Sequence, residues 1–193
     1  MWNPYFRKSL GMLLGVVSDT HNNLKNIKKI IYLFNKYSVD LVAHTGDISN
    51  ANALDKFSDL NCDLVGVFGN NDRVEKGLKE TALLYKFDFK DPPLLISKSR
   101  RNIAIFHEPD NIEKFLIENQ GIDIVLHGHT HRYREEIHNG TLIFNPGESA
   151  GMFKGKNAVG LVDLTNLTTQ RIFFWWNKRE VLQGYKNLNL NKG

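Results

Sequence analysis

The sequence predicts an α/β protein in which two sheets pack face to face with helices on the outside. In the first third of the chain, short apolar runs alternate with helical patterns, as in a parallel sheet. The later half carries pairs of short apolar runs joined by turns, as in hairpins. A chain of 193 residues is long enough to form one domain with a sizeable core.

Three continuous apolar runs, at residues 13–17, 41–43 and 64–68, predict strands that are buried on both faces. Residues 24–34 place apolar side chains at helical spacing with lysines on the other side, and residues 53–60 suggest a short helix. A polar loop follows each strand. Because ligands bind beyond the carboxyl ends of parallel strands, we expect these loops to face one crevice.

The later elements follow a rigid break at Pro92-Pro93. Asn139-Gly140 is a strong hairpin turn signal between two of them. The expected elements are paired strands at 94–97 and 103–106, a helix at 111–119, and strands at 122–126, 134–137, 141–144, 158–164 and 169–176.

We expect one domain over residues 12–182, an extension at residues 1–11 and a polar tail at residues 183–193. The apolar stretch at residues 10–17 is too short and interrupted for a signal peptide. No run is long enough to span a membrane, so we expect a cytoplasmic protein without a membrane partner.

The cysteine count and the charge distribution exclude or disfavour several kinds of site. The single cysteine, Cys62, excludes an intramolecular disulfide and a thiolate metal cage. The net charge is +4, but the basic residues are dispersed among acids. This pattern favours a solvated surface over a dedicated nucleic-acid groove.

Polar clusters directly follow five of the apolar runs. They mix Asp, Asn and His, which are the ligands of two-metal hydrolytic sites. The clusters are Ser18-Asp19-Thr20-His21, Gly46-Asp47, Gly69-Asn70-Asn71-Asp72, Phe106-His107-Glu108 and His127-Gly128-His129-Thr130-His131.

Histidines dominate the last cluster. Its imidazoles at alternate positions suit borderline metals, and Gly128 removes a side chain where the backbone must come close. His127 is the least certain ligand of the three, and a structural role is the alternative interpretation. Asp19 and His21 are expected to point to the same side of an extended segment, although such a pair is common by chance.

The middle clusters have plainer alternatives when each is taken alone. Asp47 has two oxygens and can bridge two cations about 3.5–4 Å apart. Asn70 offers a carbonyl oxygen to a metal and an N–H to a phosphoryl oxygen, but Asn70-Asn71 is also typical of a turn. A lone histidine after a strand, such as His107, is more often structural, although its place between the other clusters favours a ligand.

In this order the clusters resemble those of the calcineurin-like metallophosphoesterase superfamily. Together with Asn145-Pro146-Gly147, they are most similar to its small YfcE-type phosphodiesterase branch. The resemblance implies a four-layer α/β/β/α sandwich of two mixed sheets flanked by helices. It also implies a binuclear metal-dependent phosphodiesterase, a phosphoric diester hydrolase in which a metal-bridging hydroxide attacks phosphorus.

The resemblance assigns seven ligands to two divalent metal ions, with Asp47 as the bridge and Asp47, Asn70 and His107 as catalytic residues. We expect Mn²⁺ first, with Ni²⁺, Zn²⁺, Fe²⁺ and Co²⁺ as alternatives, and a small or nucleotide-like phosphodiester as substrate; self-association stays open. One metal would be held by Asp19, His21, Asp47 and His131, the other by Asp47, Asn70, His107 and His129.

Three positions depart from the family pattern. Asn71 stands where many members have a histidine that protonates the leaving group. Glu108 and Glu148 replace the usual Gly after the strand-end His and the usual Ser after Asn-Pro-Gly. Glu108 either adds negative charge beside the site or faces solvent.

Two other functions compete with the phosphodiesterase hypothesis. A non-catalytic protein-binding scaffold shares this fold, and the aromatic stretch at residues 173–176 could form an interface or a buried strand. Such scaffolds tend to lose metal ligands, which this chain keeps. A nuclease is disfavoured by the modest net charge.

Overall fold

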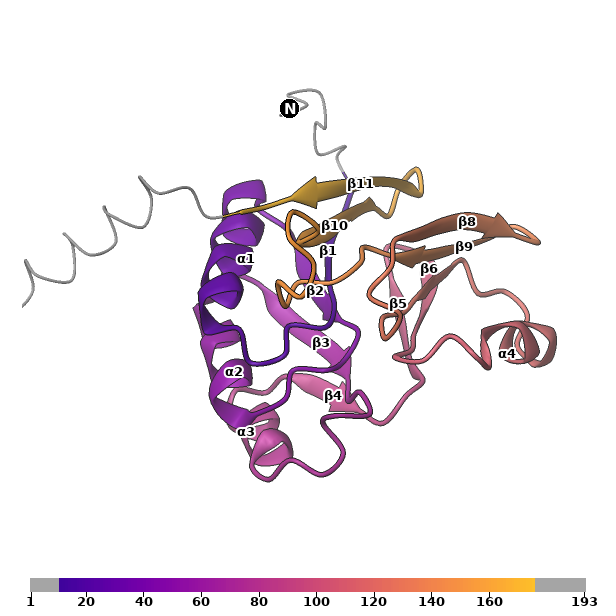
Figure 1. Cartoon of the computed structure of the whole chain (residues 1–193). Coiled ribbons are helices and arrows are strands. Elements are labelled where there is room, and N and C mark those ends of the chain that lie inside the picture. Colours follow the sequence, from indigo (N-terminus) through magenta and orange to yellow (C-terminus); the bar gives the residue numbers. More distant parts are fainter. Residues whose placement is uncertain (1–10, 176–193) are drawn as a thin grey trace, which may run out of the picture.

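Two mixed β-sheets form the centre of the computed structural model, which describes residues 11–175 (Figure 1). The elements in chain order are β1 (Leu13–Val17), α1 (Leu24–Tyr37), β2 (Leu41–His44), α2 (Ala51–Lys56), the 3-10 turn η1 (Phe57–Asp59), β3 (Asp63–Val67), α3 (Leu78–Leu84), β4 (Asp88–Lys90), β5 (Leu94–Lys98), β6 (Arg101–Ile105), α4 (Ile112–Glu118), β7 (Ile124–Leu126), β8 (Arg134–His138), β9 (Thr141–Asn145), β10 (Ala158–Asp163) and β11 (Thr168–Phe173).

The first sheet has the strand order β11-β10-β1-β2-β3-β4, and the second has the order β5-β6-β7-β9-β8. Strands β1 to β4 are parallel, and β10 and β11 join them as an antiparallel pair. In the second sheet β6, β7 and β9 are parallel, with β5 and β8 antiparallel at the edges. Both sheets are therefore mixed, as predicted.

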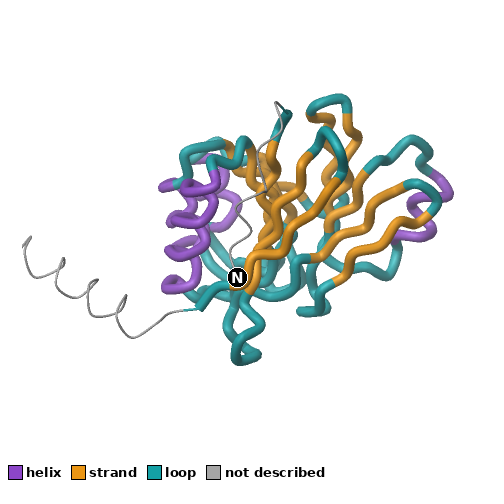
Figure 2. The backbone as a smooth tube through the Cα atoms, turned by 90° about the horizontal axis from the view of Figure 1, so that it is seen from above, coloured by secondary structure: helices purple, strands orange, loops and turns teal. Residues whose placement is uncertain are grey.

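Three apolar layers separate four layers of secondary structure. Ile27 and Phe34 of α1 pack against the first sheet, whereas Leu14 and Phe144 belong to the core between the sheets. A smaller core around Ile112 joins α4 to the second sheet. Helices α1, α2 and α3 cover one outer face and α4 the other (Figures 1 and 2). The predicted α/β/β/α sandwich is confirmed.

Strand β1 shows why the early apolar runs are continuous. Leu13 and Val17 face the helices, while Leu14 and Val16 face the second sheet. Because successive side chains of a strand point to opposite faces, a strand covered on both sides needs apolar residues at every position. All five residues of β1 are buried.

Two elements in residues 78–90 escaped prediction. In α3, Leu83 and Leu84 are 78% and 73% exposed, so the apolar residues do not mark one buried face. Strand β4 is short and places the charged Asp88 and Lys90 beside β3. Neither segment shows the periodicity from which the other elements were predicted.

The last predicted strand ends earlier than expected. β11 stops at Phe173; Phe174 is buried whereas Phe173 and Trp175 are exposed. This alternation agrees with a chain segment that covers the core with one face only. Trp176, most of the predicted extension at 1–11 and the tail at 183–193 lie outside the described residues. Within the described range, no helix is long and apolar enough to cross a membrane.

The parallel strands of each sheet bring their carboxyl ends to one edge. The loops after β1, β2 and β3 thereby meet the loops after β6 and β7. All five polar clusters of the sequence lie in these loops. The topology therefore assembles them into one site, as the strand pattern predicted.

Candidate metal centre

The loop after β1 carries Asp19 and His21 in a conformation that the sequence did not predict. Both residues have positive φ angles, 52° and 38°, so the expectation of an extended segment is wrong. In this conformation the loop bonds to the loop after β2: the Asp19 N–H donates to the Gly46 carbonyl (3.1 Å) and the His21 N–H to the Asp47 carbonyl (3.0 Å). The two side chains still converge, with His21 Nε2 4.0 Å from Asp19 Oδ1.

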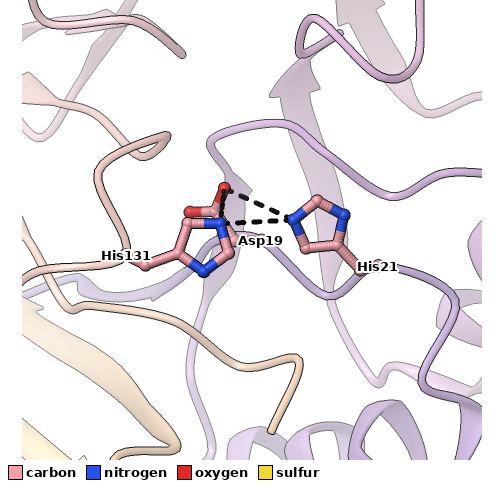
Figure 3. Close-up of side chains that lie close together, drawn as sticks. All are labelled: Asp19, His21 and His131. Atoms are coloured by element: carbon pink, nitrogen blue, oxygen red, sulfur yellow. Dashed lines mark hydrogen bonds and ion pairs between the residues drawn. The ribbon is translucent and has the colours of Figure 1, made fainter. Parts of the chain in front are cut away.

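Asp19 is fully buried, and its two oxygens have different surroundings. Oδ2 accepts hydrogen bonds from the Ser18 hydroxyl and, at 3.2 Å, from the His129 N–H. Oδ1 accepts no hydrogen bond from the described part of the chain and lies 3.5 Å from His131 Nε2. Figure 3 shows Asp19, His21 and His131 converging, with the Nε2 atoms of the two imidazoles 3.3 Å apart.

Asp47 lies between two groups of side chains. Its Oδ2 is 3.6 Å from His21 Nε2, and its Oδ1 is 3.4 Å from His107 Nε2. Asn71 holds this carboxylate from the side: its backbone N–H donates to Oδ1 (3.0 Å) and its side-chain amide to Oδ2 (2.7 Å). The carboxylate is 2% exposed and has a fixed orientation.

The amide oxygen of Asn70 lies between two imidazoles. Asn70 Oδ1 is 2.9 Å from His107 Nε2 and 3.1 Å from His129 Nδ1. The other ring nitrogen of His107, Nδ1, faces the Thr45 carbonyl at 2.8 Å. A hydrogen bond there fixes the tautomer in which Nε2 is free to act as a ligand.

The structure thus brings all seven predicted residues into one site. Asp19, His21 and His131 offer ligand atoms that all lie within 4.8 Å of one another, and so do Asp19, Asp47 and His107. The site therefore has one end at His21 and His131 and another end at His107. Asp19 and Asp47 lie between these two ends. Asn70 and His129 complete the end at His107.

Burial and charge act in opposite directions on the ionisable groups. Burial raises the pKa of Asp19 and outweighs the hydrogen bond from Ser18. Burial also acts to raise the pKa of Asp47, but the hydrogen bonds and charge of His107 and the donors of Asn71 hold that pKa below its usual range. For His107, burial acts to lower the pKa, but Asp47 and Asp19 outweigh it and raise that pKa.

Two glycines allow the loops to approach this closely. A side chain at Gly128 would collide with Ser18 Oγ, which confirms the close backbone approach predicted there. A side chain at Gly69 would collide with Asp47 Oδ1. The carboxylates can therefore reach their positions only because both neighbouring positions lack Cβ atoms.

Asp72 is a supporting residue whose role the sequence analysis missed. Its carboxylate accepts hydrogen bonds from the N–H groups of Ile48 (2.8 Å), Ser49 (2.7 Å) and Gly69 (2.8 Å). These bonds tie the loop after β2 to the loop after β3. Asp72 follows Asn70-Asn71 in a turn, so its sequence position indicated proximity to the site but no partner.

His44 is a second supporting residue that was missed, because it lies within a strand. Its Nδ1 accepts a hydrogen bond from the Gly46 N–H (3.1 Å), and its Nε2 is 3.1 Å from Thr20 Oγ1. Burial lowers the pKa of His44 to about 3, so its imidazole is neutral. His44 therefore fixes the turn that presents Asp47.

His127, the least certain ligand in the sequence, lies outside both groups of candidate ligands. Its Nδ1 is 3.1 Å from the Gly128 carbonyl, and the Asn145 amide donates to the same carbonyl (3.0 Å). Burial lowers the pKa of His127 to about 4. His127 belongs to neither of the two ligand groups and supports the loop that carries His129 and His131.

The glutamates that depart from the family pattern belong to neither of the two ligand groups. Glu108 is half-exposed and pairs with Arg73 (3.2 Å), so it neither fills the site nor stands unpaired. Glu148 is fully buried, and its carboxylate accepts hydrogen bonds from the N–H groups of residues 151–153. It anchors the loop between β9 and β10.

The donor set fits divalent metal ions. Asp19 Oδ1 is a buried carboxylate oxygen with no hydrogen-bond donor among the described residues, an arrangement that is costly unless a cation faces it. The surrounding imidazole nitrogens and the amide oxygen are neutral ligands of borderline metals.

The family of this chain follows from comparison with known proteins. Residues 12–167 match the model of the calcineurin-like phosphoesterase superfamily domain. The chain is 32% identical over 155 residues to the phosphodiesterase MJ0936 of Methanocaldococcus jannaschii, a match that covers 79% of this chain and 93% of that protein. The chain therefore belongs to the calcineurin-like phosphoesterase superfamily, and the predictions of this superfamily and of a phosphoesterase are confirmed.

Solved structures agree with this assignment. A structure described as a novel archaeal phosphodiesterase superposes with a TM-score of 0.77 at 30% identity, covering 84% of this chain and 100% of that one. YfcE, a phosphoesterase from E. coli, superposes with a TM-score of 0.60 at 20% identity, covering 83% of this chain and 98% of that one. The second likeness concerns the fold alone.

Proposed function

We propose that this protein is a binuclear metal-dependent phosphodiesterase that acts on small or nucleotide-like phosphodiesters. One observation carries the proposal: seven donor side chains from five separate loops converge, with the Asp47 carboxylate between the two ends of the site. One cation would be held by Asp19, His21, Asp47 and His131, and the other by Asp47, Asn70, His107 and His129. Mn²⁺ is our first choice. Imidazole, carboxylate and amide ligands also admit Ni²⁺, Zn²⁺, Fe²⁺ and Co²⁺, which are the alternatives.

Two bound cations would polarise the phosphoryl group and lower the pKa of a water near it. In the reaction the water oxygen bonds to phosphorus, the P–O bond to one arm of the diester breaks, and the departing oxygen takes up a proton. Asn70 lies at the mouth of the site, and its amide N–H can donate to a phosphoryl oxygen. Its oxygen faces His107 and His129, which orients the amide.

Asn71 determines which leaving groups suit this enzyme. Its two N–H groups donate to Asp47, so it positions the bridging carboxylate and has no acidic proton to give. General-acid help contributes about 10²–10⁴-fold where it exists. Diesters whose leaving group departs without a proton, such as p-nitrophenolate esters, should therefore react much faster than alkyl diesters.

The scaffold alternative requires a site without catalytic metals. Retention of all seven donors in one converging arrangement disfavours it. A panel of phosphomonoesters, cyclic nucleotides and linear diesters, each tested with Mn²⁺, Ni²⁺ and Zn²⁺, separates the functions. Metal-dependent hydrolysis of an activated diester supports the proposal. If the fully metal-loaded protein hydrolyses no member of the panel, the proposal is wrong.

A further inference from the structure

A pocket of about 600 Å³ adjoins the candidate metal centre through Thr130 and His131. Its other walls come from the segment before β8, from the loop between β9 and β10, and from β11. Figure 1 shows that β8 and β11, the edge strands of the two sheets, lie on the same side of the molecule. We call this cavity the side pocket. Its volume is that of an ordinary small-molecule site.

The side pocket is basic. Three of its lining residues, Arg132, Lys156 and Arg171, carry positive charge, and none of its eight described lining residues carries a carboxylate. The Glu135 carboxylate, which accepts a hydrogen bond from the Tyr133 hydroxyl, is an acidic neighbour of this wall. Three cationic side chains in one concave surface outnumber it and attract anionic ligands. This local excess contrasts with the mixed charges over the rest of the sequence.

Arg171 is held in a fixed orientation within the pocket. Its Nε donates a hydrogen bond to the Pro146 carbonyl (2.7 Å). Its guanidinium carbon lies 4.8 Å from the ring centre of Tyr133 and 4.3 Å from that of Phe173. Because the group is already ordered by these contacts, it loses little conformational freedom when it binds an anion.

Flat and apolar side chains stand beside these charges. Tyr133, Met152 and Phe153 line the pocket and are 44%, 59% and 57% exposed. Exposed aromatic rings next to cationic side chains are a common platform for nucleobases, because every base has a face that can stack. The side pocket therefore combines the features that recognise a ring and an anion.

Glu148 holds the loop that forms one side of the side pocket. Its buried carboxylate accepts the N–H groups of Gly151 (2.8 Å), Met152 (3.3 Å) and Phe153 (3.1 Å). These bonds fix the loop that presents Phe153 and Lys156 to the pocket. The departure at Glu148 thus has a positioning role.

We propose that the side pocket binds one arm of the phosphodiester substrate, and that this arm carries a flat ring and a second anionic group, as in a nucleoside bisphosphate. This proposal rests on the phosphodiesterase function of the adjoining metal centre. The reacting phosphate lies at the metal ligands, and the arm passes His131 into the side pocket. Arg132, Lys156 and Arg171 face the second anion, while Tyr133 and Phe153 face the ring.

The test uses thymidine 3′,5′-bisphosphate as the probe and methyl phosphate as the reference, with binding to the Mn²⁺-loaded protein measured by calorimetry. Lys156→Gln should weaken binding of the bisphosphate about tenfold, since a charge-assisted contact is worth about 1.5 kcal/mol and about 1.4 kcal/mol is tenfold. Phe153→Ala should weaken it about fivefold or more through lost stacking. Methyl phosphate binding should not change.

Lys154→Gln is the matched control, because Lys154 lies two residues from Lys156 in the same exposed loop but does not line the side pocket. The proposal is overturned if Lys154→Gln and Lys156→Gln weaken bisphosphate binding equally, or if the bisphosphate binds no more tightly than methyl phosphate. Arg132→Gln, at another residue that lines the side pocket, should weaken bisphosphate binding in the same way.

Hydrolysis separates this proposal from the proposed function. Methyl p-nitrophenyl phosphate and thymidine 3′-phosphate 5′-p-nitrophenyl phosphate share a leaving group and differ in the second arm. Lys156→Gln should lower kcat/KM about tenfold for the second substrate only. If neither diester is hydrolysed while binding still depends on Lys156, the phosphodiesterase function is wrong and the side pocket stands. If the unmodified protein and Lys156→Gln hydrolyse both diesters equally well, the phosphodiesterase function stands and the proposed role of the side pocket is wrong.

Discussion

The two sheets contribute chemically different halves of the candidate metal centre. The first sheet supplies both carboxylates, Asp19 and Asp47, which are 0% and 2% exposed and bonded to neighbouring loops. The second sheet supplies three imidazoles, of which His107 is buried while His129 and His131 lie on a more open loop. Buried anions cost free energy without a cation, whereas imidazoles on an open loop, such as those of His129 and His131, cost little. We infer that metal binding stabilises mainly the half built on the first sheet.

The largest effect should come from Asp47→Asn, which removes the carboxylate shared by both ends of the site. Because charge stabilisation by bound metals is worth several kcal/mol and about 1.4 kcal/mol is tenfold, we expect hydrolysis of bis(p-nitrophenyl) phosphate to fall about 10³-fold. Glu108→Gln removes a half-exposed carboxylate that pairs with Arg73, and should change the rate less than about twofold. Comparable losses in both variants would contradict the assignment.

Asp72→Ala should destabilise the part of the site that is built on the first sheet, although Asp72 is not one of the seven candidate metal ligands. Three backbone N–H groups lose their charged acceptor, so we expect about 3 kcal/mol of lost stability in chemical denaturation. The metal-loaded protein should also lose activity, because the loops after β2 and β3 come apart. An unchanged unfolding midpoint would show that these bonds do not hold the loops together.

The stability of the metal-free protein should depend on His44 at acid pH. The pKa of His44 is about 3 in the fold against an ordinary value of 6.5, so the unfolded chain gains a proton first as the pH falls. The contribution of His44 to stability is therefore constant above pH 6.5 and falls below it. Between about pH 8 and about pH 5 this single group should cost about 2 kcal/mol. His44→Gln should reduce the acid-induced loss by that amount in urea titrations; parallel pH curves would refute the buried neutral state.

A smaller effect on stability should distinguish the part of the site on the first sheet from the part on the second sheet. For Asp19→Asn, the sign of this effect should depend on whether metal is present. In chelator, Asp19→Asn removes a buried charge without a hydrogen-bond donor on Oδ1 and should stabilise the protein by about 1 kcal/mol. With Mn²⁺ the same variant should be the less stable one. His131→Gln should leave the chelated protein unchanged within about 0.5 kcal/mol and weaken metal binding. Thermal unfolding with and without metal measures all of these, and destabilisation by Asp19→Asn in chelator would contradict the inferred asymmetry.

The order of the strands and the seven converging residues could be predicted from sequence for a physical reason. Buried parallel strands need continuous apolar runs, and Asp19, Asp47 and Asn70 each lie within three residues after the end of such a strand. Ligands at strand ends are therefore marked by an abrupt change from apolar to polar residues. The change from apolar to polar residues marked the candidate loops, and the family resemblance assigned the seven candidate ligands within them.

The supporting residues could not be predicted because their partners are distant in sequence. Asp72 bonds to residues 48 and 49, and Asn71 bonds to Asp47, across a turn whose geometry depends on both loops. Glu148 appeared as a departure until its bonds to residues 151–153 were seen. α3 was missed because its exposed Leu83 and Leu84 hide the helical pattern.

The central claim is that Asp47 joins two metal ions into one hydrolytic site. Metal-depleted protein can be titrated with Mn²⁺ while bound metal and hydrolysis of bis(p-nitrophenyl) phosphate are measured in the same samples. We predict two Mn²⁺ ions per chain, with activity rising as the second ion binds, and loss of both stoichiometry and activity in Asp47→Asn. Full activity with one ion per chain, or activity that persists in excess chelator, would contradict the account.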